Sequence, residues 1–310
     1  MTAKVYLSLV NPTGVWFVRD CFADSVEEEL STQSAQDYSQ QRKEILALKE
    51  ERWTAIKSKM GESKTKTGSY FSSMVDYNGI LTLNMRGEIT EYASSWSDSG
   101  IVLSDLVPML EMVQKESGTK DQSVKGVIMR INTPGGIAVP SLNAGEQIAA
   151  INKTVPIVAY YDSLCASAGI ALTAGCAGVL CSPAIIAGGV AAVYRGIDRA
   201  DDPTKYRRVT LTSGKAKVAT ETRGEDGFLD KSAIASRQSE IDKLGTQFVD
   251  FVALNRNMDA DKKKTLAEGG YWIGKEVLQS GLVDKIALWF DAKADATKLI
   301  MKLNAERKDS

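Results

Sequence analysis

Beyond Tyr70, short apolar runs alternate along the chain with stretches whose apolar positions recur at helical spacing. Runs of Ile, Val and Leu predict strands, and the amphipathic stretches predict helices between them. The expected elements are strands at 80–85, 126–131, 157–161, near Val179 and at 208–212, and helices at 103–115, 141–151, from Ala166 and at 232–255. This alternation predicts an α/β domain with a mostly parallel sheet and flanking helices.

The two ends of the chain follow a different pattern. Residues 1–69 predict a small N-terminal extension with two short strands and a charged helix over 25–60, closed by a polar Gly/Ser/Thr/Lys link at 61–69. Residues 70–290 form the predicted α/β domain, and 291–310 a polar C-terminal tail.

The composition and net charge of the chain limit the classes of partner that we expect it to bind. The 310 residues carry 38 basic and 39 acidic side chains, for a formal net charge of −1. This balance provides no general attraction for nucleic acid or anionic lipid, and no apolar run reaches the roughly 18 residues that span a bilayer. The first ten residues lack the pattern of a secretory leader. We therefore expect a cytoplasmic protein with no nucleic-acid or membrane partner.

The cysteines do not predict a metal site. Cys21, Cys165, Cys176 and Cys181 lack the close pairing of a metal knuckle, and three of them lie in an Ala/Gly/Leu-rich stretch. Buried cysteine behaves as a small hydrophobic residue, which is the interpretation we favour here, in a reducing compartment. We expect no metal and no cofactor.

The chain contains no histidine. This excludes a Ser/His/Asp or Cys/His hydrolase mechanism within the chain and every imidazole acid/base role. Any catalysis must take its base from lysine, aspartate, glutamate or a chain terminus.

Two junctions between a strand and the following loop carry candidate chemistry. The first is Thr-Pro-Gly-Gly at 133–136, after the strand at 126–131. Proline and two glycines make a sharp turn whose N–H groups no side chain covers, as an oxyanion hole requires. The alternative is a plain turn between strand and helix.

The second junction is Cys-Ala-Ser-Ala-Gly at 165–169, which opens a helix of small residues. A serine at a helix N-terminus lies at the positive end of the helix dipole, and small neighbours let a substrate carbonyl reach its oxygen. Ser167 is therefore a candidate nucleophile. The alternative is an ordinary N-cap serine.

A lysine can act as the base only if its pKa falls from about 10.4 to near 7 or 8, which requires an apolar pocket. The candidates are Lys217 and Lys215, in Ser-Gly-Lys-Ala-Lys at 213–217, just past a predicted strand. For either lysine the alternative is a solvated position in a loop.

Taken together and in order, these motifs resemble the SppA family of serine peptidases. The set comprises TPGG at 133–136, ASAG at 166–169 and SGKAK at 213–217, followed by a long helix, YWIGKEV at 271–277 and GLVD at 281–284. The resemblance covers about residues 78–287 and includes the related bacteriophage head-maturation proteases. It implies a fold similar to that of ClpP and the crotonases.

The resemblance implies a Ser/Lys dyad, which agrees with the missing histidine. Ser167 matches the nucleophile and Lys217, in preference to Lys215, the general base. The N–H groups of Gly136, or its neighbour Gly135, and of Ala168 match the oxyanion hole. Relatives form rings, so a homo-oligomer is expected.

The sequence departs from the family after the nucleophile helix. Residues 187–191 read Ala-Gly-Gly-Val-Ala where relatives carry Gly-Ser-Ile-Gly-Val, so a hydroxyl that could orient the lysine is lost. The nearest candidate replacements in the sequence are Ser182 and Ser213. After Lys217 the chain continues Val-Ala-Thr-Glu, which also differs from relatives.

The lack of a recognisable anchor favours the phage branch, and hence cleavage of scaffold, portal or capsid precursor proteins during prohead maturation. Three alternatives stay open. They are a non-catalytic head-assembly or scaffold-binding protein on the same fold, a bacterial SppA-like peptidase without an anchor, and a crotonase-type acyl-CoA enzyme.

Overall fold

The fold is described from a computed structural model of the chain. It describes residues 15–18, 75–92, 100–119, 122–199, 206–212, 228 and 231–308, with the backbone alone at 15–18, 195–199, 206–212, 232–233 and 308. Cys21, the predicted helix at 25–60 and the segment 213–227 lie outside these residues.

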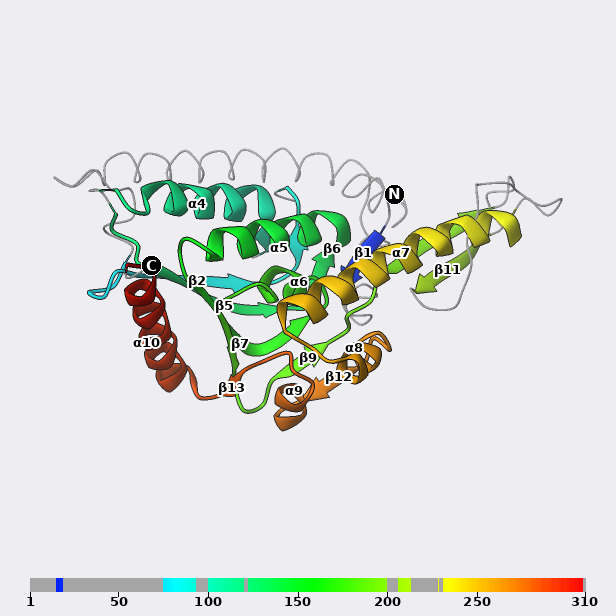
Figure 1. The fold of residues 1–310 in the computed structure, drawn as a ribbon. Coiled ribbons are helices and arrows are strands. Elements are labelled where there is room, and N and C mark those ends of the chain that lie inside the picture. The colour runs from blue at the N-terminus through cyan, green and yellow to red at the C-terminus, as the bar shows by residue number, and fades with distance from the viewer. Residues whose placement is uncertain are drawn as a thin grey trace.

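The central sheet of the described residues is mostly parallel (Figure 1). Its main path runs in the order β12 (Tyr271–Ile273), β9 (Ile186–Gly188), β7 (Ile157–Ala166), β5 (Gly126–Thr133) and β2 (Ile80–Arg86), while β8 (Gly178–Cys181) pairs with both β7 and β13 (Lys285–Ile286). Only β12 is antiparallel to its neighbour, β9. The prediction of an α/β domain with a mostly parallel sheet is confirmed.

A second sheet lies beside the first. Its order is β11 (Tyr206–Thr212), β10 (Val193–Arg199), β1 (Val15–Val18), β6 (Gly135–Ile137), β3 (Ile89–Thr90) and β4 (Ile101–Val102). Strand β1 is antiparallel to both of its neighbours, and its Phe17 pairs with Gly136. Part of the predicted N-terminal extension is therefore a strand beside the Thr-Pro-Gly-Gly loop.

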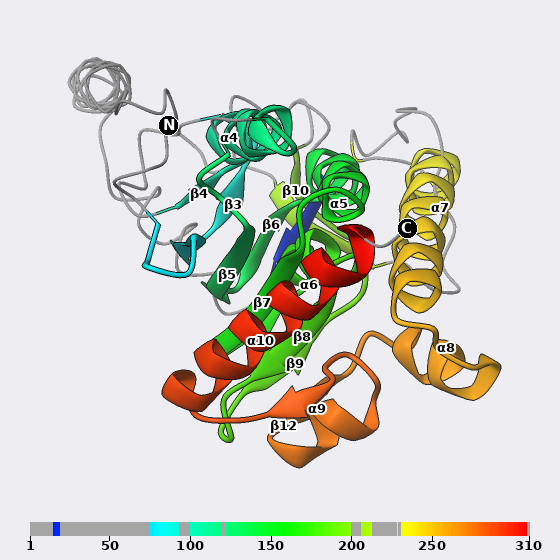
Figure 2. The ribbon, with the colours of Figure 1, turned by 60° about the vertical axis from the view of Figure 1, so that its left-hand side comes forward.

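Helices cover both faces of the central sheet (Figure 2). One face of the sheet lies toward a group of four helices. They are α4 (Leu103–Glu116), α5 (Ala138–Asn152), α6 (Ala168–Thr173) and α7 (Lys231–Asn255). Two short helices, α8 (Ala260–Leu266) and α9 (Lys275–Gln279), follow α7. The opposite face is covered by α10 (Trp289–Lys308).

The segment predicted as a polar C-terminal tail forms most of α10 and packs on the sheet. Ala292, Ala296 and Ile300 are buried against a cluster that includes Ile80 and Ile128. Their spacing of four residues puts them on one helix face, so the helix buries an apolar stripe although its composition is polar. None of the described helices is long and apolar enough to cross a membrane.

Two element boundaries near the candidate junctions differ from the prediction. Strand β7 continues to Ala166, so Ser167 follows it directly. Helix α5 begins at Ala138 rather than at Ser141. Pro140 lies in its first turn, where a missing N–H removes no helical hydrogen bond, so the helix begins ahead of the proline.

Candidate active site

The two predicted junctions meet because β5 and β7 are neighbouring parallel strands that end together. Thr133 pairs with Cys165 after a shift of register that follows Ile131. The residues that follow both strands therefore leave the sheet at the same end, the carboxyl end of the strands. Parallel pairing thus places the loop at 134–136 beside the start of helix α6.

Ser167 has an unusual backbone conformation at this end of the sheet. Its φ is 51° and its ψ is −113°, and it lies directly before the first residue of α6. A side chain at positive φ is strained by about 1–3 kcal/mol, so the surroundings must hold it there. The Ser167 N–H donates to the carbonyl oxygen of Gly188 at 2.8 Å, which ties the turn to β9.

The Ser167 hydroxyl does not cap its helix. Its side chain makes no capping hydrogen bond, and Oγ is buried without a hydrogen-bond partner among the described residues. A capping serine would accept a hydrogen bond from an N–H of the first turn. The geometry therefore excludes the N-cap alternative and leaves the hydroxyl free to act on another group.

The candidate oxyanion donors differ in whether their N–H groups already have a hydrogen-bond acceptor. The Gly135 N–H donates to Thr133 Oγ1 at 3.1 Å, so it is already used. Ala168 is the first residue of α6, and the first N–H groups of a helix have no acceptor within the helix. Gly136 in turn pairs with Phe17 of β1 and with Ile89 of β3, so both glycines remain candidates to act with Ala168.

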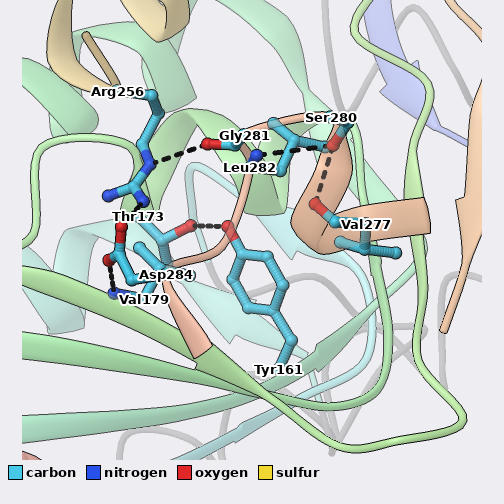
Figure 3. A network of polar contacts seen from close by, with 9 residues as sticks. All are labelled: Tyr161, Thr173, Val179, Arg256, Val277, Ser280, Gly281, Leu282 and Asp284. Carbon is cyan, nitrogen blue, oxygen red and sulfur yellow. Dashed lines mark hydrogen bonds and ion pairs between the residues drawn. The ribbon is translucent and has the colours of Figure 1, made fainter. Parts of the chain in front are cut away.

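Helix α6 is anchored at both of its ends. At Gly169, a Cβ atom would lie 2.4 Å from Thr133 Cγ2 and 3.0 Å from Cys165 Sγ, so only glycine allows this approach to the strands. The Tyr161 hydroxyl and Thr173 Oγ1 are 2.7 Å apart (Figure 3). Thr173 Oγ1 also donates to the carbonyl oxygen of Gly169. Burial raises the pKa of Tyr161 well above its usual value, so it stays a neutral phenol.

The Gly-Leu-Val-Asp motif has a structural contact that the sequence did not predict. Asp284 forms an ion pair with Arg256 and accepts the Val179 N–H at 2.7 Å (Figure 3). Arg256 also donates to the carbonyl oxygen of Gly281 at 3.4 Å. The motif thus joins the end of α7 to β8, away from Ser167.

The described cysteines are free and buried. Burial raises the pKa of the Cys165 thiol, and raises that of Cys176 to about 12 and that of Cys181 to about 11. Thiols with raised pKa values are poor nucleophiles because the thiolate is the reactive form. Cys165 lies two residues from Ser167 and does not compete with it.

The candidate base lies outside the described residues. Lys217, Lys215 and Ser213 all lie in the segment outside the described residues. Ser182 is described, and its N–H donates to the carbonyl oxygen of Tyr161. Tyr161 is six residues before Ser167, about 20 Å along an extended strand, so Ser182 cannot orient a group at Ser167.

Glu88 is a partly buried carboxyl beside the loop that leads to β6. The neighbouring Gly87 N–H donates to the carbonyl oxygen of Asn132 at 3.0 Å, and Ile89 pairs with Gly136. Desolvation raises the pKa of Glu88 from 4.5 to about 7. The folded state therefore holds a proton that the unfolded state releases between these pH values, and stability falls as pH rises through this window.

We expect Glu88→Gln to stabilise the protein at pH 8 by up to about 3 kcal/mol, because it removes the cost of a desolvated charge. At pH 4 the carboxyl is protonated in the folded state and the substitution should change little. Urea unfolding at both pH values measures the difference. An equal effect at both would contradict a raised pKa for Glu88.

Comparison with known proteins adds a family match. The model of Peptidase family S49 matches residues 149–303, half of the chain. A putative signal peptide peptidase SppA of Enterococcus faecium is 27% identical over 229 residues, covering 72% of this chain and 64% of that protein. The putative protease slr0021 of Synechocystis is 26% identical over 182 residues, covering 58% and 65%.

The chain spans just under two thirds of the length of both relatives. Among solved structures, a mutant of ClpP1 from Listeria monocytogenes matches with a TM-score of 0.41 and 14% identity, covering 66% of this chain and 90% of that one.

Proposed function

Because the chain belongs to peptidase family S49, we propose that it is a serine endopeptidase that cleaves a protein or peptide substrate through Ser167. One observation supports this most directly. A strained serine directly follows the end of a parallel strand, and its buried hydroxyl neither caps the helix nor meets another described partner. Strain and an unsatisfied buried group are characteristic of functional positions.

In the proposed mechanism, the neutral amine of Lys217 takes the proton of the Ser167 hydroxyl, and Oγ attacks the peptide carbonyl carbon. The N–H groups of Gly136 and Ala168 donate to the oxyanion that forms. The lysine then gives its proton to the leaving amine, and water releases the acyl group from Ser167. The role of Lys217 rests on the family motif alone.

The identity of the substrate is a separate proposal from the peptidase activity. The resemblance to head-maturation proteases favours scaffold, portal or capsid precursors of a phage prohead in the host cytoplasm, processed by a homo-oligomer. The relatives from Enterococcus faecium and Synechocystis do not point to a phage. Portal and capsid genes beside the coding gene would favour this substrate, and a different gene neighbourhood would favour a bacterial substrate.

Chemical labelling tests the proposed activity without knowledge of the substrate. A fluorophosphonate should bond through phosphorus to Ser167 Oγ with loss of fluoride, giving one adduct that peptide mapping places on Ser167. Cleavage of casein should disappear in proportion to labelling. Uncut casein and an unlabelled Ser167 would favour the non-catalytic assembly protein, and a thermal shift with acyl-CoA would favour the crotonase-type enzyme.

A further inference from the structure

Strand β7 is interrupted shortly before it leads to Ser167. Its pairing with β5 is regular up to Ile131 and Tyr161, and it resumes at Thr133 and Cys165. Between these two pairs β5 advances by two residues, whereas β7 advances by four. Strand β7 therefore contains two residues more than its neighbour at this point.

The other side of β7 changes its partner at the same place. Tyr161 is the last residue that pairs with β8, and Leu164 is the first that pairs with β9. Among the described strands, Asp162 and Ser163 therefore pair with no strand on either side. We call these two residues the β7 bulge. Extra residues of this kind bend a strand and change the direction of the residues that follow, and they are common next to active sites.

The β7 bulge sets how far β7 reaches toward the site. If the pairing before the bulge continued, Thr133 would lie opposite Ser163 instead of Cys165. The end of β7 would then be displaced along β5 by two residues, or about 7 Å. The bulge therefore contributes to the position of Ser167 relative to the loop at 134–136.

The carboxylate of Asp162 anchors the β7 bulge. Arg130 Nη2 donates to both of its oxygens, at 2.9 and 3.0 Å, and the more exposed Arg86 donates to one of them at 3.5 Å. Since Arg130 belongs to β5 and Arg86 to β2, the carboxylate ties the unpaired residues to the next two strands of the sheet. The side chains of Asp162 and Arg130 are 17% and 24% exposed, so solvent screens their contact less than that of a surface ion pair.

The start of helix α10 holds Arg130 in place. The guanidinium carbon of Arg130 lies 4.6 Å from the centroid of the Trp289 ring, and this ring packs against Tyr160 with centroids 5.0 Å apart. Trp289 is the first residue of α10, which lies across this face of the sheet (Figure 2). A guanidinium stacked on an aromatic ring is pre-organised, so Arg130 offers Asp162 a fixed partner.

Stability alone does not account for this ion pair. Arg130 Nε is buried without a hydrogen-bond partner among the described residues. Apolar residues often replace a partly buried ion pair without loss of stability, so such a pair is weak evidence of stabilisation. The pair lies where β7 has no strand partner, five residues ahead of Ser167, which calls for a role in the placement of that end of the strand.

We propose that Asp162 is a positioning residue of the Ser167 site, which acts through its contact with Arg130 to fix the β7 bulge and hence the place of the Ser167 oxygen. This inference rests on the proposed serine peptidase function. The effect passes along the backbone of residues 163–166, without contact between Asp162 and the substrate. A misplacement of about 1 Å at a reacting group costs about 100-fold in rate, so a bulge released from its anchor should slow the reaction.

The test compares Asp162→Ala with a matched control, Ile300→Ala. Ile300 is buried under α10 and lies against Gly126 at the start of β5, away from the β7 bulge. Both variants should lower Tm, the first by leaving Arg130 without its partner and the second by opening a cavity. The substrate is a fluorogenic peptide built from a site at which the wild-type protein cuts casein.

The rates are measured at a temperature at which circular dichroism shows every variant to be folded. We expect Asp162→Ala to lower kcat by about 10- to 100-fold with KM within about twofold, and Ile300→Ala to leave both constants unchanged. The rate at which a fluorophosphonate labels Ser167 should fall together with kcat, because labelling requires the same placement of Oγ.

A double variant separates positioning from stability. Arg130→Met combined with Asp162→Ala removes both charges of the pair, so Tm should recover toward the wild-type value while kcat stays low. Three results would each overturn the role of Asp162: wild-type kcat in Asp162→Ala, an equal loss of kcat in Ile300→Ala, or recovery of kcat together with Tm in the double variant. Ser167→Ala is measured in parallel, and if that variant kept full activity the proposed function itself would fail.

Discussion

Ser167→Ala is expected to reduce casein cleavage by about a thousandfold or more, as loss of a nucleophile does in other serine peptidases. The fold should remain intact. Alanine keeps the Cβ atom and therefore the backbone strain at φ 51°, and the lost hydroxyl has no partner among the described residues. We expect the free energy of unfolding to stay within about 1 kcal/mol of the wild-type value.

Mass spectrometry of the casein digest and urea unfolding of the same preparation measure both quantities. Lys217→Ala should match Ser167→Ala in activity, whereas Lys215→Ala should keep most of the wild-type rate. The reverse result for the two lysines would move the base to Lys215. Activity that survives in Ser167→Ala and in both lysine variants would remove the dyad and favour a non-catalytic role.

Gly136→Ala is expected to damage stability and activity together. A Cβ atom at this position would lie 1.9 Å from the carbonyl oxygen of Ile89 and 2.6 Å from its carbonyl carbon. Both are backbone atoms of β3, which cannot swing aside as a side chain can. Strand β3 or β6 must shift, at a cost of about 3 kcal/mol. A displacement near 1 Å at the proposed oxyanion donor costs about 100-fold in rate.

Gly270→Ala is the matched control, because a Cβ atom there meets nothing within 4 Å. Urea unfolding and casein cleavage should leave this variant close to wild type. A Gly136→Ala protein of wild-type stability would show that β3 yields easily. Wild-type activity in that variant would remove Gly136 from the oxyanion hole.

The local pattern of the chain predicted many elements well. The apolar run from Ile80 predicted β2, and helical spacing predicted α4 and α7 to within one residue at their ends. Boundaries near the site were harder, because β7 continues through a polar stretch that includes Asp162 and Ser163. A strand that pairs with neighbouring strands on both sides can continue through polar residues, although the apolar run in the sequence ends there.

The sequence by itself determined which chemistry is possible. The absence of histidine excluded an imidazole base. The strand-end motifs, taken in order, resemble those of the SppA family, and this resemblance implied a serine nucleophile with backbone oxyanion donors. These conclusions depend on residue types and local spacing, which are properties of the chain before it folds.

Only the tertiary structure decided which groups meet. The register of β5 against β7 brings Thr133 beside Cys165, and β1 enters the sheet beside Gly136. The approach of α5 to α6 brings Gly145 against Ala171, although these residues are far apart in sequence. Such contacts depend on packing between distant segments, and the periodicity of one segment contains no information about its partner.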